Sequence, residues 1–285
     1  MNVNAAVDPR GNASRVQDRE FAWTSADFDR VQSLIYRRAG ISLHDGKHAM
    51  VYSRLSRRLR ETGHQSFKAY LCWLESTDGD EWQEFVNALT TNLTSFFREH
   101  HHFQIFAQHL KSRPAGYAWK VWCSAASTGE EPYSIVMTAL DALGRRPSFS
   151  LMASDIDSKV LATAANGVYK AESLKGLSAA QMQTHFLRGR GSNQGLVRVK
   201  PELRQWVEFL IINLMDDEWP FRDAFDMVFC RNVMIYFDAE TQRRVLERIH
   251  RVLKPGGILF VGHAENFNDS RDLFVLKGKT AYERR

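Results

Sequence analysis

Two carboxylates stand at the end of a run of small residues. The run Ala125–Ser134 (AASTGEEPYS) follows the β-rich segment Trp119–Cys123 and contains Glu130 and Glu131. Small residues let a backbone approach a ligand closely, and because this run has one glycine it lacks the spacing of a dinucleotide fingerprint. A carboxylate at Glu131 would suit a cationic amino group. The alternative is that both glutamates only complement the positive end of a helix dipole.

Acidic and amide side chains follow the next two β-rich segments. Asp155 comes directly after Phe149–Ser154, at about the interval from the glycine at which an acidic side chain binds ribose hydroxyls in nucleotide-binding folds. Asp157 is expected to cap the following helix. Asn213 and Leu214 could offer an amide and an apolar surface to an adenine ring, although a loop asparagine more often serves only its own turn.

Three further polar residues follow the β-rich segment Phe225–Cys230. Arg231, Asn232 and Tyr236 are expected at the carboxyl edge of the sheet, where substrate and cofactor meet. Tyr236 could instead be a core aromatic residue, but its hydroxyl needs a partner.

The segment 89–99 (LTTNLTSFFRE) is too rich in Thr, Asn and Ser for a plain linker. It could fold over the sheet edge and present Arg98 to an anion, while capping of the next helix explains part of its polarity. The three histidines at 100–102 lack a Cys, Asp or Glu set at metal spacing, so no metal is predicted.

An alternation of strands and helices must bring these residues together. After about residue 117, short β-rich segments alternate with helical ones, which indicates a parallel α/β sheet. The expected strands are Trp119–Cys123, Phe149–Ser154, Val207–Ile212, Phe225–Cys230 and Ile258–Gly262. Residues 171–204 interrupt the pattern with several glycines and predict an inserted β-rich subdomain. Residues 274–282 predict a closing antiparallel hairpin, and Lys254–Gly257 (KPGG) a turn.

Residues 21–88 predict a separate bundle of helices. The expected helices start at Thr24 or Ser25, at about Asp45, at 66 and at 80, with Gly40 and Gly63 ending the first two. Residues 89–116 would then join this domain to the sheet domain at 117–285, and residues 1–20 are expected to form a mobile tail.

The composition indicates an ordinary globular protein. Of 285 residues, 44% are hydrophobic and 25% charged, which suits two domains. No apolar run approaches the ~18 residues of a membrane span, and the first residues lack a secretory signal, so we expect a cytoplasmic protein without membrane insertion. Cys72, Cys123 and Cys230 are too scattered for a disulfide framework. No long heptad pattern stands out, and a monomer is expected.

The excess of positive charge is concentrated partly on the second expected helix. The net charge is +5, and helical spacing places Lys47, Arg54, Arg57 and Arg58 within an arc of about 100°. Such a face is usually only solvated. The alternative is that this basic face docks to an acidic helix or to nucleic acid. The absence of interleaved aromatic residues favours an acidic protein surface as the partner.

Six motifs together resemble the chemotaxis receptor glutamate O-methyltransferases, the CheR-type family. They are NALTTNLTSFFRE at 87–99, AASTGEEPYS at 125–134, SDID at 154–157, CRNVMIYFD at 230–238, LKPGG at 253–257 and GHAENF at 262–267. The resemblance spans residues 24–283. It implies an N-terminal all-α domain, a class I S-adenosylmethionine-dependent methyltransferase domain of the α/β class, and a small antiparallel β-subdomain inserted in it.

The resemblance also implies a set of site residues. S-adenosyl-L-methionine would be the methyl donor and S-adenosyl-L-homocysteine the product, with Arg98 and Tyr236 next to the transferring methyl. The implied cofactor contacts are Asn92, Thr94, Arg98, Glu131, Asp155, Asn213, Leu214, Arg231 and Asn232.

The implied substrate is a set of glutamates on the cytoplasmic helical bundle of a chemoreceptor. The docking residues that this implies on the basic helix are Arg54, Arg57 and Arg58. Some family members add a receptor's C-terminal pentapeptide as a strand to the β-subdomain. The glycines that resemble those of their loop are Gly189, Gly191 and Gly195. No nucleic-acid partner is expected.

The implied chemistry needs no general base, because a glutamate with a pKa near 4.3 is ionised at pH 7. A dry site that holds oxygen, carbon and sulfur in line would supply most of the acceleration. The alternatives are a methyltransferase of the same fold acting on RNA or a small molecule, and a non-catalytic module that docks on receptors or senses the cofactor. A nicotinamide dehydrogenase is disfavoured because the glycine fingerprint is missing.

Overall fold

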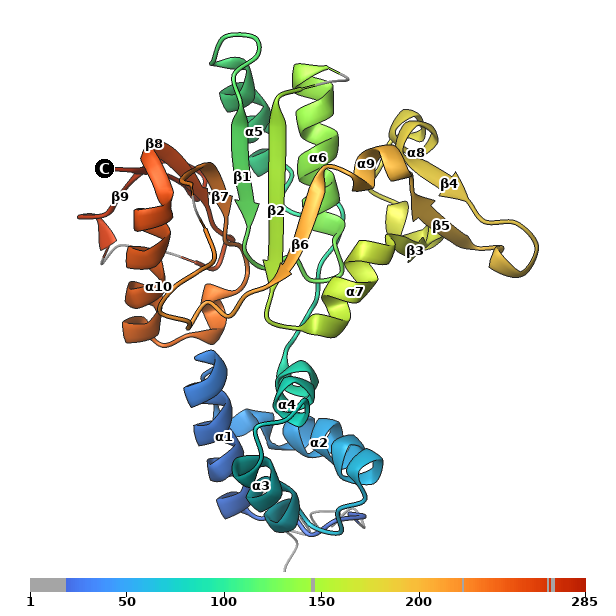
Figure 1. Cartoon of the computed structure of the whole chain (residues 1–285), viewed down its shortest axis with the longest axis vertical. Coiled ribbons are helices and arrows are strands. Elements are labelled where there is room, and N and C mark those ends of the chain that lie inside the picture. The colour runs from blue at the N-terminus through green and yellow to red at the C-terminus, as the bar shows by residue number, and fades with distance from the viewer. Residues whose placement is uncertain (1–18, 145–146, 222, 266, 268–269) are drawn as a thin grey trace, which may run out of the picture.

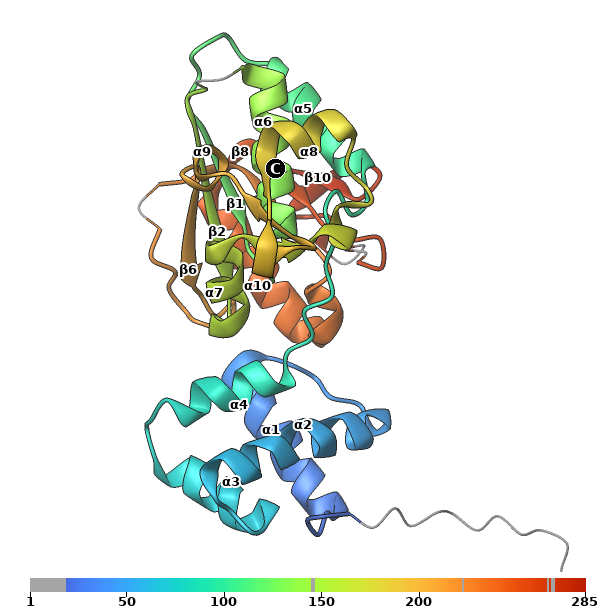
Figure 2. The ribbon, with the colours of Figure 1, turned by 90° about the vertical axis from the view of Figure 1, so that its right-hand side faces the viewer.

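A computed structural model describes residues 19–144, 147–221, 223–265, 267 and 270–285. It has a helical N-terminal domain below a larger sheet domain, and one segment after α4 connects the two (Figure 1). Figure 2 shows the same two bodies from the side. Residues 1–18 of the predicted tail lie outside the described residues.

The N-terminal domain contains the predicted helices. They are α1 (Ser25–Ala39), η1 (Asp45–Lys47), α2 (His48–Thr62), α3 (Phe67–Ser76) and α4 (Glu81–Leu89). Thr24 caps α1 in a capping box with Asp27, and Gly40 and Gly63 end α1 and α2 with φ of 69° and 75°. The helices bury a core of their own that includes Phe28, Leu55, Phe67, Tyr70 and Phe85. The predicted starts and stops of these helices are therefore confirmed to within a few residues.

The sheet domain has seven strands in the order β6-β2-β1-β7-β8-β10-β9. Its strands are β1 (Trp119–Cys123), β2 (Phe149–Asp155), β6 (Val207–Ile211), β7 (Phe225–Phe229), β8 (Leu253–Phe260), β9 (Phe274–Gly278) and β10 (Ala281–Arg284). The first five are parallel, and β10 pairs antiparallel with β8 and with β9. Strand order reverses on the two sides of β1, which is where open α/β sheets bind ligands.

Helices cover both faces of this sheet because buried side chains alternate along its strands. Val121 and Phe229 face α5 (His101–Lys111) and α6 (Glu130–Leu143), whereas Trp122 and Val228 face α10 (Ala239–Val252). Helix α7 (Ser158–Asn166) follows β2. The α/β fold with its antiparallel closing hairpin is thus as predicted.

The inserted subdomain is a three-stranded antiparallel sheet in the order β3-β5-β4. Its strands are β3 (Val168–Lys170), β4 (Phe186–Arg188) and β5 (Leu196–Val199), with α8 (Ala179–His185) and α9 (Pro201–Arg204) beside them. The short segments η2 (Ala171–Leu174) and η3 (Gly191–Asn193) complete it. The sheet begins before the predicted boundary at residue 171, because β3 directly follows α7 and is too short to stand out in the sequence.

The predicted turn at Lys254–Gly257 is wrong, because β8 already begins at Leu253. The pairing of β8 with β7 shifts in register between Phe225 and Met227 of β7, and a Cβ at Gly257 would lie 2.9 Å from the carbonyl oxygen of Asp226. Glycine is therefore needed where the irregular strand passes close to its neighbour.

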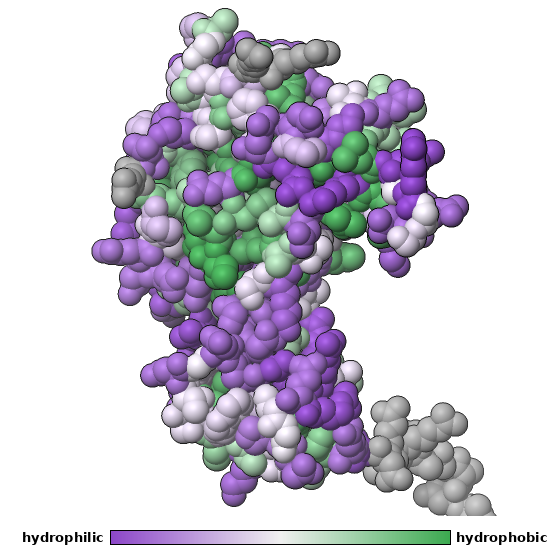
Figure 3. All heavy atoms as spheres, turned by 45° about the vertical axis from the view of Figure 1, so that its right-hand side comes forward, coloured by the Kyte–Doolittle hydropathy of each residue, from purple (hydrophilic) through white to green (hydrophobic). Residues whose placement is uncertain are grey.

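The two domains present different surfaces. Figure 3 shows a mostly hydrophilic face on the N-terminal domain and an apolar area on the sheet domain. A groove over β1, β2 and β6 is lined by apolar side chains such as Met152, Val207 and Phe221. Within the described ranges, no helix combines the length and apolar character of a membrane span.

Candidate functional site

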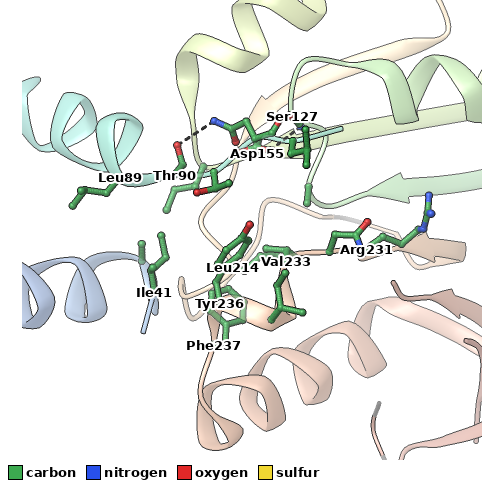
Figure 4. A pocket seen from close by; sticks show the side chains of 18 of the residues that line it. Ile41, Leu89, Thr90, Ser127, Asp155, Leu214, Arg231, Val233, Tyr236 and Phe237 are labelled. Carbon is green, nitrogen blue, oxygen red and sulfur yellow. Dashed lines mark hydrogen bonds between the residues drawn. The ribbon is translucent and has the colours of Figure 1, made fainter. Parts of the chain in front are cut away.

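A pocket lies at the carboxyl ends of β1, β2, β6 and β7, where the N-terminal domain faces the sheet domain (Figure 4). It brings together all the residues predicted for the cofactor and the methyl group. These are Asn92, Thr94, Arg98, Glu131, Asp155, Asn213, Leu214, Arg231, Asn232 and Tyr236. They come from five separate stretches of the chain, so only the fold makes them neighbours.

The N-terminal domain closes this pocket, which the sequence did not predict. Ile41, Ser42, Leu43, His44 and Lys47, after the end of α1, line it together with the sheet residues. The first four belong to a short connection between helices with no motif of its own, and Lys47 is the last residue of η1. The sequence offers one weak indication of their role, which is that they follow Gly40, the residue that ends α1.

Hydrogen bonds hold the two domains together around the pocket. The Tyr36 hydroxyl donates to Asp238 Oδ2 at 2.6 Å, and the backbone N–H of Ser42 donates to the carbonyl oxygen of Tyr236 at 2.8 Å. Asn213 Nδ2 donates to the carbonyl oxygen of Arg38 at 2.7 Å, and Asn213 Oδ1 accepts from its own turn. The Asn213 side chain therefore joins the domains and serves its turn, rather than standing free for an adenine ring.

The segment 89–99 runs along the pocket as predicted. Thr90 Oγ1 and Asn92 Nδ2 donate to Asp157 Oδ2 at 2.6 and 2.8 Å, and Ser127 Oγ donates to the carbonyl oxygen of Asn92 at 2.9 Å. Asp157 also caps α7 through Oδ1, which confirms that prediction. Arg98 Nη1 donates to the carbonyl oxygen of Leu93 at 2.9 Å, so the segment folds back on itself and holds Arg98 at the pocket.

Asp155 ends β2 with its carboxylate at the pocket, as Figure 4 shows. Its oxygens accept from the backbone N–H groups of Ser127 at 2.8 Å and Asp157 at 3.0 Å. Burial raises the pKa of Asp155 to about 6, and these N–H donors oppose the shift. A nearly buried carboxylate in this position is suited to accept from the hydroxyl groups of a ligand that excludes water.

Arg231 lies between two glutamates beneath the pocket. Its guanidinium forms ion pairs with Glu131 and, at 3.2 Å, with Glu99, and it donates to the carbonyl oxygen of Arg98. Burial alone lowers the pKa of Arg231, but Glu131 and Glu99 outweigh it and raise the pKa. One guanidinium with two carboxylates leaves one net negative charge, which complements an ammonium group.

The Arg231 side chain itself is fully buried, and in Figure 4 it extends away from Leu214 and Tyr236. Because this guanidinium is buried, the structure does not support a direct contact between it and a cofactor. Arg231 lines the pocket and supports Glu131 from behind. This role was missed because the sequence gives no sign that Glu99 and Glu131 surround it.

Two arginines of the expected basic face of α2 have partners within the N-terminal domain and the segment that follows it. Arg58 donates from Nε to Glu81 Oε1 at 2.9 Å and also pairs with Glu61 and Glu84, and only 11% of its side chain is exposed. Arg54 donates to the carbonyl oxygens of Ala88 and Thr90. Both arginines thus connect α2 to α4 and the following segment in the free protein, and their predicted docking role stays a prediction.

Arg57 differs from its two neighbours. Its side chain is 75% exposed and pairs with Glu61, one turn away on the same helix. Such a surface pair is weak, so Arg57 can exchange it for another partner.

The glycines predicted for peptide binding shape the connection between β4 and β5. A Cβ at Gly189 would lie 2.1 Å from the carbonyl oxygen of Asn193, while Gly191 and Gly195 have φ of 57° and 85°. This connection projects from the molecule beside β4 and β5 in Figure 1.

The histidines at 100–102 do have a glutamate nearby, contrary to the sequence argument. Ligand atoms of Glu99, His101 and His102 lie within 4.8 Å of one another. However, Glu99 pairs with Arg231, and both histidines contact the carbonyl oxygen of Lys279. The Glu99 carboxylate is already paired with Arg231, which makes it a poor ligand for a metal ion.

The pocket's chemistry fits a nucleoside that carries a cationic amino acid. Asp155 can accept from ribose hydroxyls, and the negative cluster around Glu131 suits an ammonium group. Ile156, Leu214 and Phe237 supply apolar surface for a base. These features together fit S-adenosylmethionine.

Comparisons with known proteins agree with this fit. Residues 26–90 match the family description "CheR methyltransferase, all-alpha domain", and residues 92–282 match "CheR methyltransferase, SAM binding domain". A "Chemotaxis protein methyltransferase" of Klebsiella aerogenes is 53% identical over 285 residues, which cover 99% of this chain and 97% of that protein. The protein of the same name from Escherichia coli is 51% identical, with 92% of this chain and 91% of that protein covered.

Solved structures resemble the chain only distantly. A putative rRNA methylase from Clostridium thermocellum has a TM-score of 0.35 and 12% identity, over 60% of this chain and 73% of that one. This similarity is too low to say anything about substrate. The two family descriptions and the two bacterial relatives are sufficient by themselves, and the chain belongs to the CheR methyltransferase family, which binds S-adenosylmethionine.

Proposed function

We propose that this protein transfers a methyl group from S-adenosylmethionine to glutamate side chains of chemoreceptor cytoplasmic domains, in the cytoplasm, to form glutamate methyl esters. The observation that carries the proposal is a single pocket in which Asp155, the Glu131 cluster and Arg98 meet at the carboxyl edge of the sheet. The names of the bacterial relatives support the link to chemotaxis.

The roles of the residues follow from charge. The donor supplies a methyl group on a positively charged sulfur. Arg98 would hold the incoming carboxylate by a charge-assisted hydrogen bond, and Tyr236 would exclude water beside the methyl. Glutamate is already ionised at neutral pH, so no residue needs to remove a proton.

The product distinguishes this function from other methyl transfers. Incubation with methyl-labelled S-adenosylmethionine and a receptor cytoplasmic domain should label the receptor. Treatment with base should then release the label as volatile methanol, because an ester is hydrolysed and a methylated amine is not. Label that survives base treatment, or that enters RNA instead of the receptor, would rule out glutamate as the acceptor.

We also propose that Arg57 contributes to receptor docking. Substituting Arg57→Glu should raise KM for the receptor domain about 10-fold, since a cation facing an acidic surface is replaced by a like charge. Affinity for S-adenosylhomocysteine should not change. Arg113→Glu, an equally drastic reversal at an exposed site beyond the end of α5, is the matched control. Equal effects of the two reversals would mean that docking responds to net charge alone.

A receptor's C-terminal pentapeptide is a second candidate partner. The outer strands β3 and β4 of the small sheet could pair with an added peptide strand, next to the connection shaped by Gly189, Gly191 and Gly195. Titration of such a peptide onto the protein tests this, and an absence of saturable binding would remove the pentapeptide from the account.

A further inference from the structure

The motif GHAENF contributes a buried carboxylate that has no part in the chemistry proposed above. Glu265 is 4% exposed, and it is not among the residues that line the pocket. A buried carboxylate costs free energy unless its oxygens are paired. The partners of Glu265 therefore indicate what it does.

In the described part of the chain, Glu265 is hydrogen-bonded by backbone N–H groups. Oε1 accepts from the backbone nitrogen of Met234 at 2.8 Å, and Oε2 accepts from that of Asn232 at 2.9 Å. Oε2 also accepts from the backbone nitrogen of Gly262 at 2.5 Å. Burial raises the pKa of Glu265, while these donors favour its charged form and oppose the shift.

The backbone held by these bonds is unusual. Asn232 has φ of 57°, in the left-handed region that few side chains other than asparagine adopt. A Cβ at Gly262 would lie 2.3 Å from Asn232 Nδ2 and 2.9 Å from Glu265 Oε2. The chain just after β8 therefore packs closely on this turn, and a side chain at position 262 would have to displace Asn232 or Glu265.

The same turn forms part of the pocket wall. Arg231, Asn232, Val233 and Tyr236 all line the pocket, and they lie on the stretch that follows β7 and ends with η4 (Met234–Tyr236). Glu265 contacts this stretch at two backbone positions, 232 and 234, so it limits how the turn can move.

We propose that Glu265 is a positioning residue that holds residues 231–236 in the shape that binds S-adenosylmethionine. The proposal rests on the placement of that cofactor in the pocket. It adds a residue that acts on the cofactor only through the backbone of its neighbours.

Glu265→Gln is the direct test, because glutamine has the same size but offers one acceptor oxygen and an NH₂ group. At least one of the buried N–H donors then loses its partner. The dissociation constant of S-adenosylhomocysteine, measured by calorimetry, should rise about 10-fold or more, and kcat should fall because Tyr236 lies on the same turn. Glu265→Asp keeps the charge on a shorter arm and should fall between wild type and Glu265→Gln.

Glu81→Gln is the matched control. Glu81 is also a poorly exposed glutamate, with 9% of its side chain exposed, but it pairs with Arg58 in the N-terminal domain. Its loss should lower the unfolding midpoint and leave the affinity of the folded protein unchanged. If Glu265→Gln behaves in the same way, or if neither Glu265 variant folds, Glu265 belongs to the fold alone and the proposal is overturned.

These readouts are independent of the receptor. A wild-type protein that binds S-adenosylhomocysteine but methylates no glutamate would contradict the proposed function, and the effect of Glu265→Gln on binding would still decide the present proposal.

Discussion

Substitution of Arg98 by alanine should lower kcat for receptor methylation by about 100-fold or more, with the protein still folded. Arg98 lines the pocket and is held there by its bond to the carbonyl oxygen of Leu93. A group that orients the two reacting partners has its full effect in the transition state, and misplacement of a partner by about 1 Å can cost 100-fold. Steady-state kinetics at saturating donor and receptor measure the loss.

Two further variants separate charge from geometry at this position. Arg98→Lys keeps the positive charge but loses the planar fork, so it should recover only part of the rate. Arg113→Ala removes an exposed arginine far from the pocket and should keep full activity. Affinity for S-adenosylhomocysteine, measured on each variant, shows how much of the loss is cofactor binding. Normal turnover by Arg98→Ala would remove its positioning role.

The Asp155→Asn variant should bind S-adenosylhomocysteine about 10- to 100-fold more weakly at pH 7. A hydrogen bond to a charged acceptor contributes about 1.5–3 kcal/mol, and the substitution removes the charge while keeping the shape. The unfolding midpoint must be measured as well, because Asp155 also accepts from Ser127 and Asp157. Calorimetric titration gives the affinity, and an unchanged value would exclude Asp155 from the cofactor site.

The wild-type protein should show a matching dependence on pH. Since burial raises the pKa of Asp155 to about 6, the free protein holds this group mostly protonated at pH 5. If the complex needs the carboxylate, the dissociation constant should rise about 10-fold from pH 7 to pH 5. The same raised pKa means that the stability contribution of Asp155 in the free protein falls as pH rises from about 4 to about 6. Asp155→Asn should remove this pH dependence of binding, and a pH profile that persists in the variant would assign it to another group.

Much of the fold could be predicted because its signals are local. The helix start at Thr24 or Ser25, the stops at Gly40 and Gly63, and the span of β1 are set by neighbouring residues and agree with the structure. The rule that ligands bind at the carboxyl ends of parallel strands predicts from the sequence alone that Asp155 and Tyr236 share one site. Short β3 and irregular β8 were missed or misread because neither has a run of alternating residues.

The parts that could not be predicted depend on contacts between distant segments. The helical pattern places Arg58 on the same basic face as Arg57. Its pairing with Glu81 and Glu84 of α4 becomes visible only when α2 and α4 are packed together. From the sequence, Arg231 is expected to contact a ligand. The structure shows that its guanidinium pairs with Glu99 and Glu131 instead. The closing of the pocket by Ile41 and its neighbours likewise depends on how the two domains meet.

We expect the methyl donor to bind in the pocket at the carboxyl edge of the sheet. Calorimetric titration of S-adenosylhomocysteine into the full-length protein tests it most directly, beside an Ala125→Trp variant in which a large side chain fills the pocket next to β1. Saturable heat with one molecule bound per chain is expected for the wild type, and none for the filled variant. An absence of heat in the wild type, or equal binding by both proteins, would contradict it.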